Sequence, residues 1–239
     1  MRPCCVGLGL LPRRIEVVTE PTLQLHVPQR SFRCPAVSGW VNAVLNGSVE
    51  SAKQLHSTFG DYPVLLTRDL RQARAWLLQQ TRGERRCGLV AASGARRLRA
   101  DGLGVLLSAT DGHDIAHWYL NRRGDIRSSF ALEVPANEFT SQGLELDFIG
   151  VCWGGNLLWN GNGEAWEYRR LSGAKWMQVE DDSRQHFIAN AYRVLLTRAR
   201  EGMILWVPRG DQEDTTRDPA RLDDTARYLE LCGARRLGA

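Results

Sequence analysis

Two arginines, Arg198 and Arg200, stand where a helix expected over residues 183–198 gives way to an apolar strand expected over residues 203–207. A helix end at a sheet edge presents a fixed side chain to a cleft, and an arginine in that place can neutralise charge that develops on a phosphate. The alternative is that both guanidinium groups are solvated and favoured only by the negative end of the helix dipole. The spacing therefore indicates either a phosphate-directed arginine, with Arg198 as the candidate, or an ordinary helix end.

A polar loop carries a second group of such residues, Gln142, Gly143 and Glu145, directly before an apolar strand expected over residues 146–153. Glycine permits a close backbone approach or an unusual φ. The Gln142 amide can bond a phosphate, a ribose or a nucleic-acid backbone, whereas the Glu145 carboxylate can accept from a ribose hydroxyl or orient an arginine. The alternative is an ordinary turn that leads into a strand.

A third group is basic. Arg96 and Arg97 follow a strand expected over residues 87–92, and arginines in such a loop can contact a nucleic-acid backbone. The alternative for these two residues is the solvated start of a helix. We assign Thr140, in the polar loop before Gln142, to the same nucleic-acid contact.

The elements that position these residues alternate between strands and helices. A short apolar strand over residues 63–67, an amphipathic helix over 68–81 and the strand over 87–92 follow one another with short links, which is typical of a parallel α/β sheet. The other expected elements are helices over 36–46, 111–120 and 218–231, strands over 131–134, 146–153 and 203–207, and the helix over 183–198, capped by Asp182 or Ser183.

Two segments are less regular. Residues 1–24 are expected to form an irregular leader. Residues of about 154–182 are rich in glycine, asparagine and tryptophan and are expected to form an inserted, hairpin-like excursion. Tryptophans there could stack on bases, but packing of the excursion onto the domain is the favoured interpretation. The tryptophans concerned are Trp153, Trp159, Trp166 and Trp176.

Composition places limits on the chemistry. The net charge of +4 permits nucleic-acid binding without establishing it. The six cysteines contain no Cys-x-x-Cys pair, and Cys87 and Cys152 fall in expected core strands, so a reducing, cytoplasmic setting is expected. His113 and His117 have the spacing of a helical metal pair, but no third ligand is evident and no metal is expected. No apolar run approaches a membrane span, so no membrane partner is expected.

Three stretches together resemble motifs of superfamily 1 helicases similar to UvrD. The string Tyr192-Arg-Val-Leu-Leu-Thr-Arg-Ala-Arg200 resembles the sixth motif, and Phe139-Thr-Ser-Gln-Gly-Leu-Glu-Leu-Asp147 resembles the fifth. The string Phe32-Arg33-Cys-Pro35, before the first expected helix, resembles the fourth. This resemblance implies that Arg198 is an arginine finger and that Arg33 is a second contact with the γ-phosphate. It implies also that Gln142, Gly143 and Glu145 couple nucleotide to nucleic acid, and that Arg200 supports the cleft through a carboxylate.

Over about residues 25–235 the chain is also similar to the Schlafen group 3-like DNA/RNA helicase domain. The strings Tyr62-Pro-Val-Leu-Leu-Thr-Arg-Asp-Leu70 and Gly88-Leu-Val-Ala-Ala-Ser-Gly-Ala-Arg-Arg-Leu-Arg99 carry this similarity together with the fifth and sixth motifs. The resemblance implies an α/β fold, a RecA-like parallel sheet flanked by helices that forms the second motor lobe of an ATPase. Single-stranded DNA or RNA is the implied partner.

One departure from that family matters for activity. Its full members carry a Gly-x-x-x-x-Gly-Lys-Ser/Thr loop, and no Gly-Lys-Ser or Gly-Lys-Thr occurs in this sequence, whose two lysines are Lys53 and Lys175. Without that loop there is no seat for the β- and γ-phosphates. ATP and Mg²⁺ are therefore expected only with a first lobe supplied in cis or in trans, and the chain alone is not expected to hydrolyse ATP. A truncated or split gene is the expected origin, and the alternative is a non-catalytic module that binds nucleic acid or protein.

Overall fold

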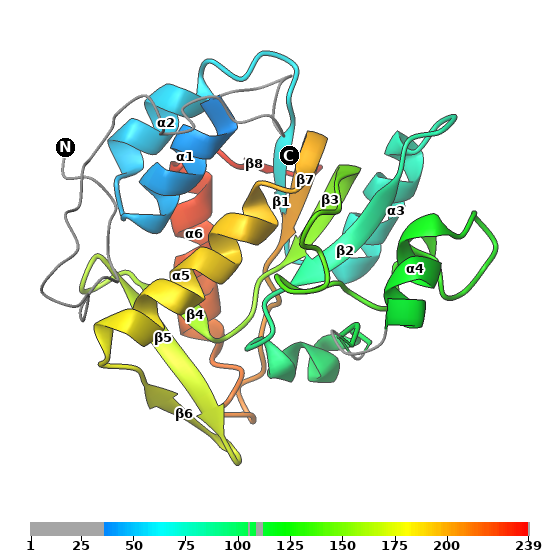
Figure 1. The fold of residues 1–239 in the computed structure, drawn as a ribbon. Helices are drawn as coiled ribbons and strands as arrows, with labels where there is room; N and C mark the ends of the chain where they lie inside the picture. The colour runs from blue at the N-terminus through cyan, green and yellow to red at the C-terminus, as the bar shows by residue number, and fades with distance from the viewer. Residues whose placement is uncertain (1–35, 105, 109–111, 239) are drawn as a thin grey trace, which may run out of the picture.

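Five parallel strands form the centre of the molecule. The computed structural model describes residues 36–104, 106–108 and 112–238. Within this part the sheet has the strand order β2-β3-β7-β1-β8, and every pairing is parallel (Figure 1). A parallel sheet is covered on both faces, which favours apolar strands, and β1, β2 and β3 here are such runs. The strands are β1 (Val64–Thr67), β2 (Cys87–Ala91), β3 (Leu146–Cys152), β7 (Ala199–Trp206) and β8 (Arg235–Arg236).

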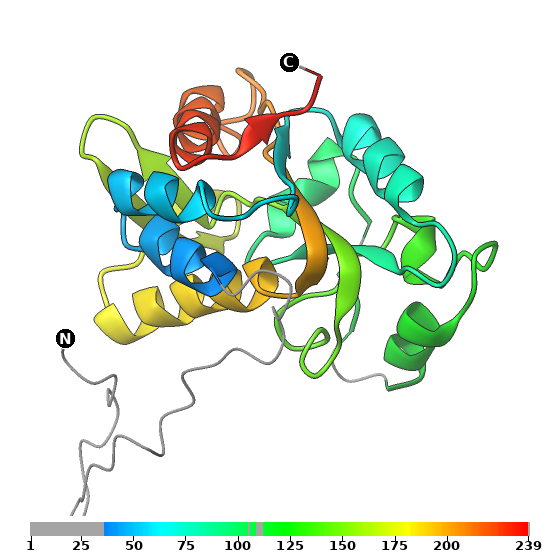
Figure 2. The same ribbon diagram turned by 90° about the horizontal axis from the view of Figure 1, so that it is seen from above.

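Helices lie on both sides of this sheet. α3 (Leu70–Gln80) packs on one face, whereas α1 (Ala36–Leu45) and α5 (Asp182–Leu196), which contact each other, lie on the opposite side (Figure 2). α4 (Gly112–Leu120) lies at the β2 end of the sheet, and α2 (Val49–His56) contacts α6 (Pro219–Leu231). Each of α3, α5 and α6 begins at an aspartate whose carboxylate accepts a backbone N–H of the first turn, which stabilises a helix by about 1 kcal/mol.

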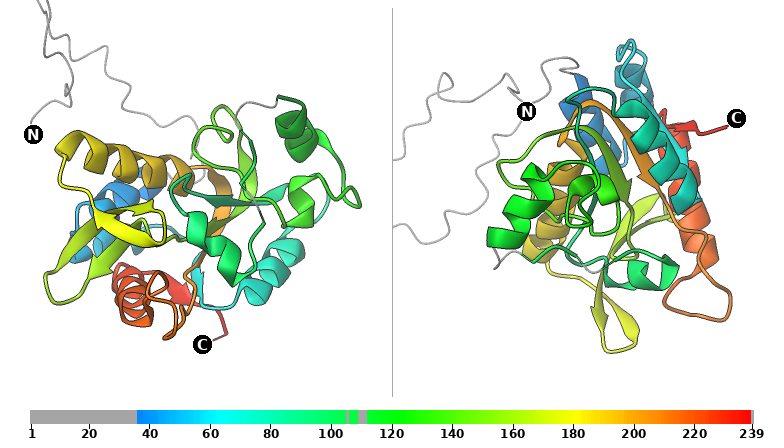
Figure 3. Two further views of the ribbon diagram at one scale, coloured as in Figure 1. Left: turned by 90° about the horizontal axis from the view of Figure 1, so that it is seen from below. Right: turned by 90° about the vertical axis from the view of Figure 1, so that its right-hand side faces the viewer.

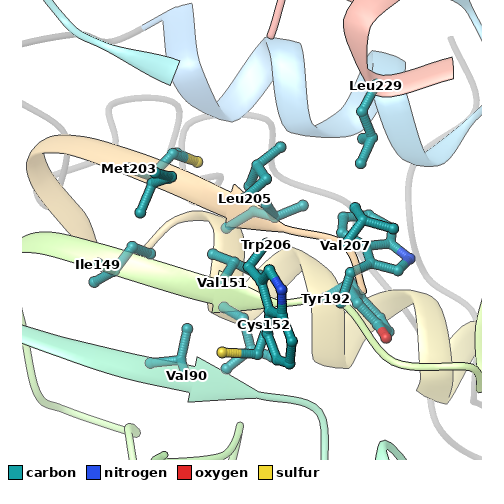
Figure 4. Packing of buried hydrophobic residues seen from close by; sticks show 14 of the residues in the cluster. Val90, Ile149, Val151, Cys152, Tyr192, Met203, Leu205, Trp206, Val207 and Leu229 are labelled. Atoms are coloured by element: carbon teal, nitrogen blue, oxygen red, sulfur yellow. The ribbon is translucent and has the colours of Figure 1, made fainter. Parts of the chain in front are cut away.

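The core lies between the sheet and these helices (Figure 4). Ile149 and Met203 are fully buried neighbours in adjacent strands. A Cβ at Gly150 would lie 2.6 Å from Leu89 Cδ2 and 2.9 Å from Leu77 Cδ1. Glycine at this position therefore allows α3 to pack closely on the sheet.

Residues 157–178 form a second, antiparallel sheet that stands beside the first (Figure 3). Its strands are β4 (Leu157–Asn160), β5 (Ala165–Ser172) and β6 (Lys175–Gln178). Trp153, Trp159 and Trp166 are buried, and the Trp159 ring stacks on Tyr228 of α6 with centroids 3.8 Å apart. Packing of these tryptophans, rather than exposure for base stacking, is thus confirmed. This aromatic cluster attaches the small sheet to the rest of the fold.

One expected strand is absent from the described structure. Residues 131–134 were expected to be extended, but the short 3₁₀ helix η3 (Ser129–Ala131) ends there and Leu132 adopts φ +55°. This left-handed conformation is incompatible with a β-strand. Of the residues that follow, Ala136 makes an isolated parallel bridge to Val90. Residues 131–134 therefore form an irregular segment in which Leu132 is buried and Glu133 is exposed.

The helix expected over residues 183–198 has different ends. It is capped by Asp181, not by Asp182 or Ser183, and α5 ends at Leu196. Thr197 ends the helix with its hydroxyl donating to the Arg193 carbonyl at 2.9 Å. β7 then begins at Ala199, four residues before the start of the expected strand. The expected strand was too short because the polar residues at 200–201 interrupt the apolar pattern. The short elements α2 and β8 were also not predicted. The 3₁₀ helix η2 (Arg96–Asp101) begins at Arg96, where a helix start was the alternative interpretation.

Candidate functional site

The polar loop and the arginine junction meet at the amino edge of the sheet. β3 and β7 are hydrogen-bonded neighbours in which Leu146 stands opposite Ala199, so the residues that precede each strand must also lie side by side. The Arg198 Nη1 donates to the Leu144 carbonyl at 3.4 Å. Arg200 Nε lies 3.8 Å from Glu145 Oε2. Segments more than fifty residues apart in the sequence thus form one cluster, which we call the amino-edge cluster (residues 142–145, 198 and 200).

The loop that leads into the cluster is held by its own side chains. The Asn137 amide oxygen accepts the backbone N–H groups of Phe139 and Thr140, at 2.9 and 3.0 Å. The Thr140 hydroxyl accepts the Asn137 N–H at 2.8 Å and is buried. Thr140 therefore lies inside the turn, and its assignment to a nucleic-acid contact stays a prediction.

Gln142 and Gly143 form the exposed tip of this loop. Gly143 has φ +81°, and no atom lies within 4 Å of the place where a Cβ would stand. Glycine is thus favoured here by the backbone conformation and not by crowding. The space around it leaves the tip accessible to a ligand or to another domain.

Two tyrosines that sequence reasoning missed fix the cluster from either side. The Tyr119 hydroxyl, on α4, donates to the Glu145 carbonyl at 3.1 Å. The Tyr62 hydroxyl, just before β1, donates to the Ala199 carbonyl at 3.2 Å. Both bonds are made to backbone atoms, so no motif marks them. Tyr62 lies in one of the strings that carry the family resemblance, and that position was the only feature of the sequence that could have marked it as part of the site.

The two arginines differ in exposure. Arg198 is 4% exposed, whereas the Arg200 side chain is 43% exposed. The Arg198 guanidinium therefore lies beneath the loop that supplies the Leu144 carbonyl, and Arg200 lies closer to solvent beside Glu145. As it stands, the cluster can present the Arg200 guanidinium and the Gln142 amide to a phosphate, whereas Arg198 is covered.

The other predicted site residues lie elsewhere. Arg96 and Arg97 belong to η2, which follows the carboxyl end of β2, so they lie at the opposite edge of the sheet from Arg198. Arg97 is ion-paired with Asp214, which also binds Arg217 Nε at 2.9 Å. Arg97 therefore has a structural partner, whereas Arg96 is exposed and lines a cavity. Arg33 lies outside the described residues.

The buried thiols and the histidine pair offer little chemistry. Burial raises the pKa of the Cys87 thiol to about 12 and that of Cys152 further, so neither forms a reactive thiolate near neutral pH. The rings of His113 and His117 have centroids 6.0 Å apart. In the part of the chain that the structure describes, no three potential ligands gather around a metal position.

Among the described residues, no helix combines the length and the apolar character that crossing a bilayer requires.

A parallel five-stranded sheet flanked by helices is compatible with the RecA-like fold class. Residues 10–209 match the family described as Schlafen group 3, DNA/RNA helicase domain, and the chain belongs to that family. No curated protein and no solved structure matches the chain. A helicase-related role in nucleic-acid metabolism follows from the family alone.

Proposed function

We propose that this chain is the second motor lobe of a superfamily 1 ATPase that acts on single-stranded DNA or RNA. It supplies arginines to a nucleotide that a P-loop lobe holds, either in the same polypeptide or in a partner. The observation that carries this proposal is the amino-edge cluster, in which Arg198 bonds the Leu144 carbonyl and Arg200 lies beside Glu145 at the ends of two neighbouring strands. Gln142 stands at the exposed tip of the same loop. Guanidinium groups placed at such an edge can stabilise charge on a transferring phosphoryl group.

In this proposal the buried position of Arg198 is a resting position. Its Nη1 bond to the Leu144 carbonyl is long, at 3.4 Å, and a bond from guanidinium to phosphate would be charge-assisted and stronger. Closure on a P-loop lobe that carries ATP and Mg²⁺ moves the 142–145 loop and frees Arg198 to approach the γ-phosphate. Glu145 remains with Arg200 and keeps that side chain in the cleft. Arg33 is the second proposed contact with the γ-phosphate.

The longer loop over residues 137–145, which includes residues 142–145, can couple bound nucleic acid to the nucleotide. Its far end is fixed at the opposite edge of the sheet, where Glu138 accepts from the Ser93 N–H at 2.9 Å and from the Ser93 hydroxyl at 2.6 Å. Its near end holds Arg198 through Leu144. A strand bound near Glu138 can therefore bias the position of Arg198 through fewer than ten residues of one loop. This is the coupling that we propose for Gln142, Gly143 and Glu145.

The test is nucleotide hydrolysis by the native assembly. The gene is replaced by tagged versions that encode the wild type, Arg198→Gln or Arg71→Gln, and each assembly is purified with the proteins that accompany it. We expect hydrolysis that a single strand stimulates, and a loss of about a thousandfold in kcat with Arg198→Gln. Arg71, on the far face of the sheet with its side chain 92% exposed, is the matched control and leaves the rate unchanged. Undiminished hydrolysis by Arg198→Gln would refute the proposed role.

The burial of Arg198 also favours a second candidate, a non-catalytic module that binds nucleic acid or protein. Arg198 is 4% exposed and therefore has no immediate access to a ligand. A simple binding module does not require an arginine that reaches a nucleotide. The two candidates differ in their response to nucleotide. Strand binding by a motor lobe changes with ATP once its partner is supplied, whereas that of a simple binder does not.

A further inference from the structure

A cavity of about 440 Å³ lies at the carboxyl edge of the sheet, away from the amino-edge cluster. Its walls are the residues that follow β2, the β5–β6 ladder and one side of α5, which lie close together in Figure 3. Arg96, Arg170 and Arg184 stand around it, one from each wall, and all three are exposed. None of the ion pairs among the described residues involves any of the three. Three exposed arginines therefore form the rim of the cavity, against a single carboxylate among the described lining residues, that of Glu138.

Arg169 lines this cavity and also a smaller neighbouring one. Arg169 Nε donates to the Gly155 carbonyl at 3.0 Å, and its guanidinium lies 5.3 Å from the centre of the Trp176 ring. Burial lowers the pKa of Arg169, whereas the carboxylates of Glu167 and Asp218 act in the opposite direction. Glu138, the carboxylate among the described lining residues, has both oxygens bonded to Ser93.

Beside this rim lies an aromatic surface. Phe187 of α5 is 55% exposed and lines the cavity, and Phe139 of the polar loop is 49% exposed. Their ring centroids are 6.1 Å apart with the planes inclined at 34°. Leaving two large apolar rings in water costs free energy. The face of a base would cover them, and stacking of bases on aromatic side chains is a common mode of single-strand binding.

We propose that this cavity seats one nucleotide of a single strand, with its phosphates on the arginine rim and its base against Phe187. A single strand fits better than a duplex, whose base faces are already stacked on one another. The inference rests on the proposed function only for the chemical class of the ligand. It goes beyond that function because it assigns the strand to residues of α5 and of the small sheet, at the edge of the main sheet opposite Arg198. Phe139 then links the bound base to the loop that holds Arg198.

The test is binding of fluorescein-labelled twelve-residue dT and U oligonucleotides to the full chain, followed by anisotropy at several salt concentrations. The variants are Arg170→Gln/Arg184→Gln and Phe187→Ala, all at exposed positions, with Arg71→Gln as the matched control. Each phosphate contact with a single strand contributes about 0.7 to the slope of log K against log salt. We therefore expect the double variant to lower the slope by about 1.4. Phe187→Ala should weaken binding roughly tenfold without changing the slope, because stacking is not a charge effect.

Two competitors complete the design. A twelve-base-pair duplex and a free mononucleotide should each displace the labelled strand poorly. The proposal is overturned if the double variant keeps the wild-type slope, if Phe187→Ala binds as the wild type does, or if the mononucleotide displaces the strand at equal concentration. Failure here is separate from failure of the proposed function, which is judged by hydrolysis with Arg198→Gln. If Arg198→Gln abolishes hydrolysis but the cavity variants bind the strand as the wild type does, the proposed function stands and only the proposed nucleotide seat in the cavity is refuted.

Discussion

Replacing Gly143 by alanine isolates the backbone conformation on which the amino-edge cluster depends. No atom lies within 4 Å of the new Cβ, so the substitution creates no clash. The cost comes from φ +81°, which is worth about 1–2 kcal/mol in an L-residue. Alanine also restricts the unfolded chain, which returns about 0.4–1 kcal/mol. The expected net loss in the free energy of unfolding is therefore about 1 kcal/mol.

Urea unfolding followed by tryptophan fluorescence measures this loss, since the chain has eight tryptophans. With an m value of about 3 kcal/mol/M, a loss of 1 kcal/mol lowers the midpoint by about 0.3 M. Gly143→Asn should cost less, because asparagine tolerates a left-handed conformation. Gly210→Ala should cost more, because its Cβ would lie 2.3 Å from the Arg217 carbonyl oxygen. The reasoning is refuted if Gly143→Ala is as stable as the wild type, or as damaging as Gly210→Ala.

Three further predictions concern burial. Burial lowers the pKa of His56 below its ordinary 6.5; stability present above that pH is lost as pH falls through the lowered pKa. Urea midpoints should therefore drop between pH 7 and pH 5, and less so in His56→Gln. Because burial raises the thiol pKa values of Cys87 and Cys152, iodoacetamide at pH 8 should label neither residue in the folded chain and both in denaturant, as peptide mass spectrometry would show. Tyr192→Phe should cost about 1–3 kcal/mol, because it leaves a buried backbone N–H without its acceptor. Tyr228→Phe should cost about 1 kcal/mol or less, because the carbonyl it releases keeps a tryptophan donor; equal losses in urea unfolding would contradict the last pair.

The main sheet could be predicted because its strands have an unambiguous pattern. β1, β2 and β3 are short apolar runs that a parallel sheet buries on both faces, and the helix between β1 and β2 has regular apolar spacing. The run at 131–134 has apolar residues on both sides of the exposed Glu133, yet it does not form a strand. A short segment that packs on the core can have the same composition whether it is a strand or irregular, so tertiary packing determines its secondary structure. β7 was predicted too short for the opposite reason, since its first residues are polar.

The candidate site was predicted in part. Motif positions singled out Gln142, Glu145 and Arg198, and the pairing of β3 with β7 brings the two segments that carry them together. The burial of Arg198 could not be foreseen, because it depends on where the 142–145 loop lies in space. The cavity at the carboxyl edge was also out of reach except for Arg96. Arg170 and Arg184 lie far from Arg96 in the sequence. All three line one cavity only because the small sheet lies beside α5.

The proposed function depends most directly on one contact, between Arg198 and the γ-phosphate of a nucleotide held by a P-loop lobe. A structure of the native assembly with ADP, Mg²⁺ and aluminium fluoride in place of the transferring phosphoryl group would measure that contact. We expect an Arg198 Nη atom within about 3 Å of the fluoride group, with the Leu144 carbonyl released. If Arg198 remains bonded to Leu144 while other residues surround the phosphoryl mimic, this chain is not the source of the arginine finger.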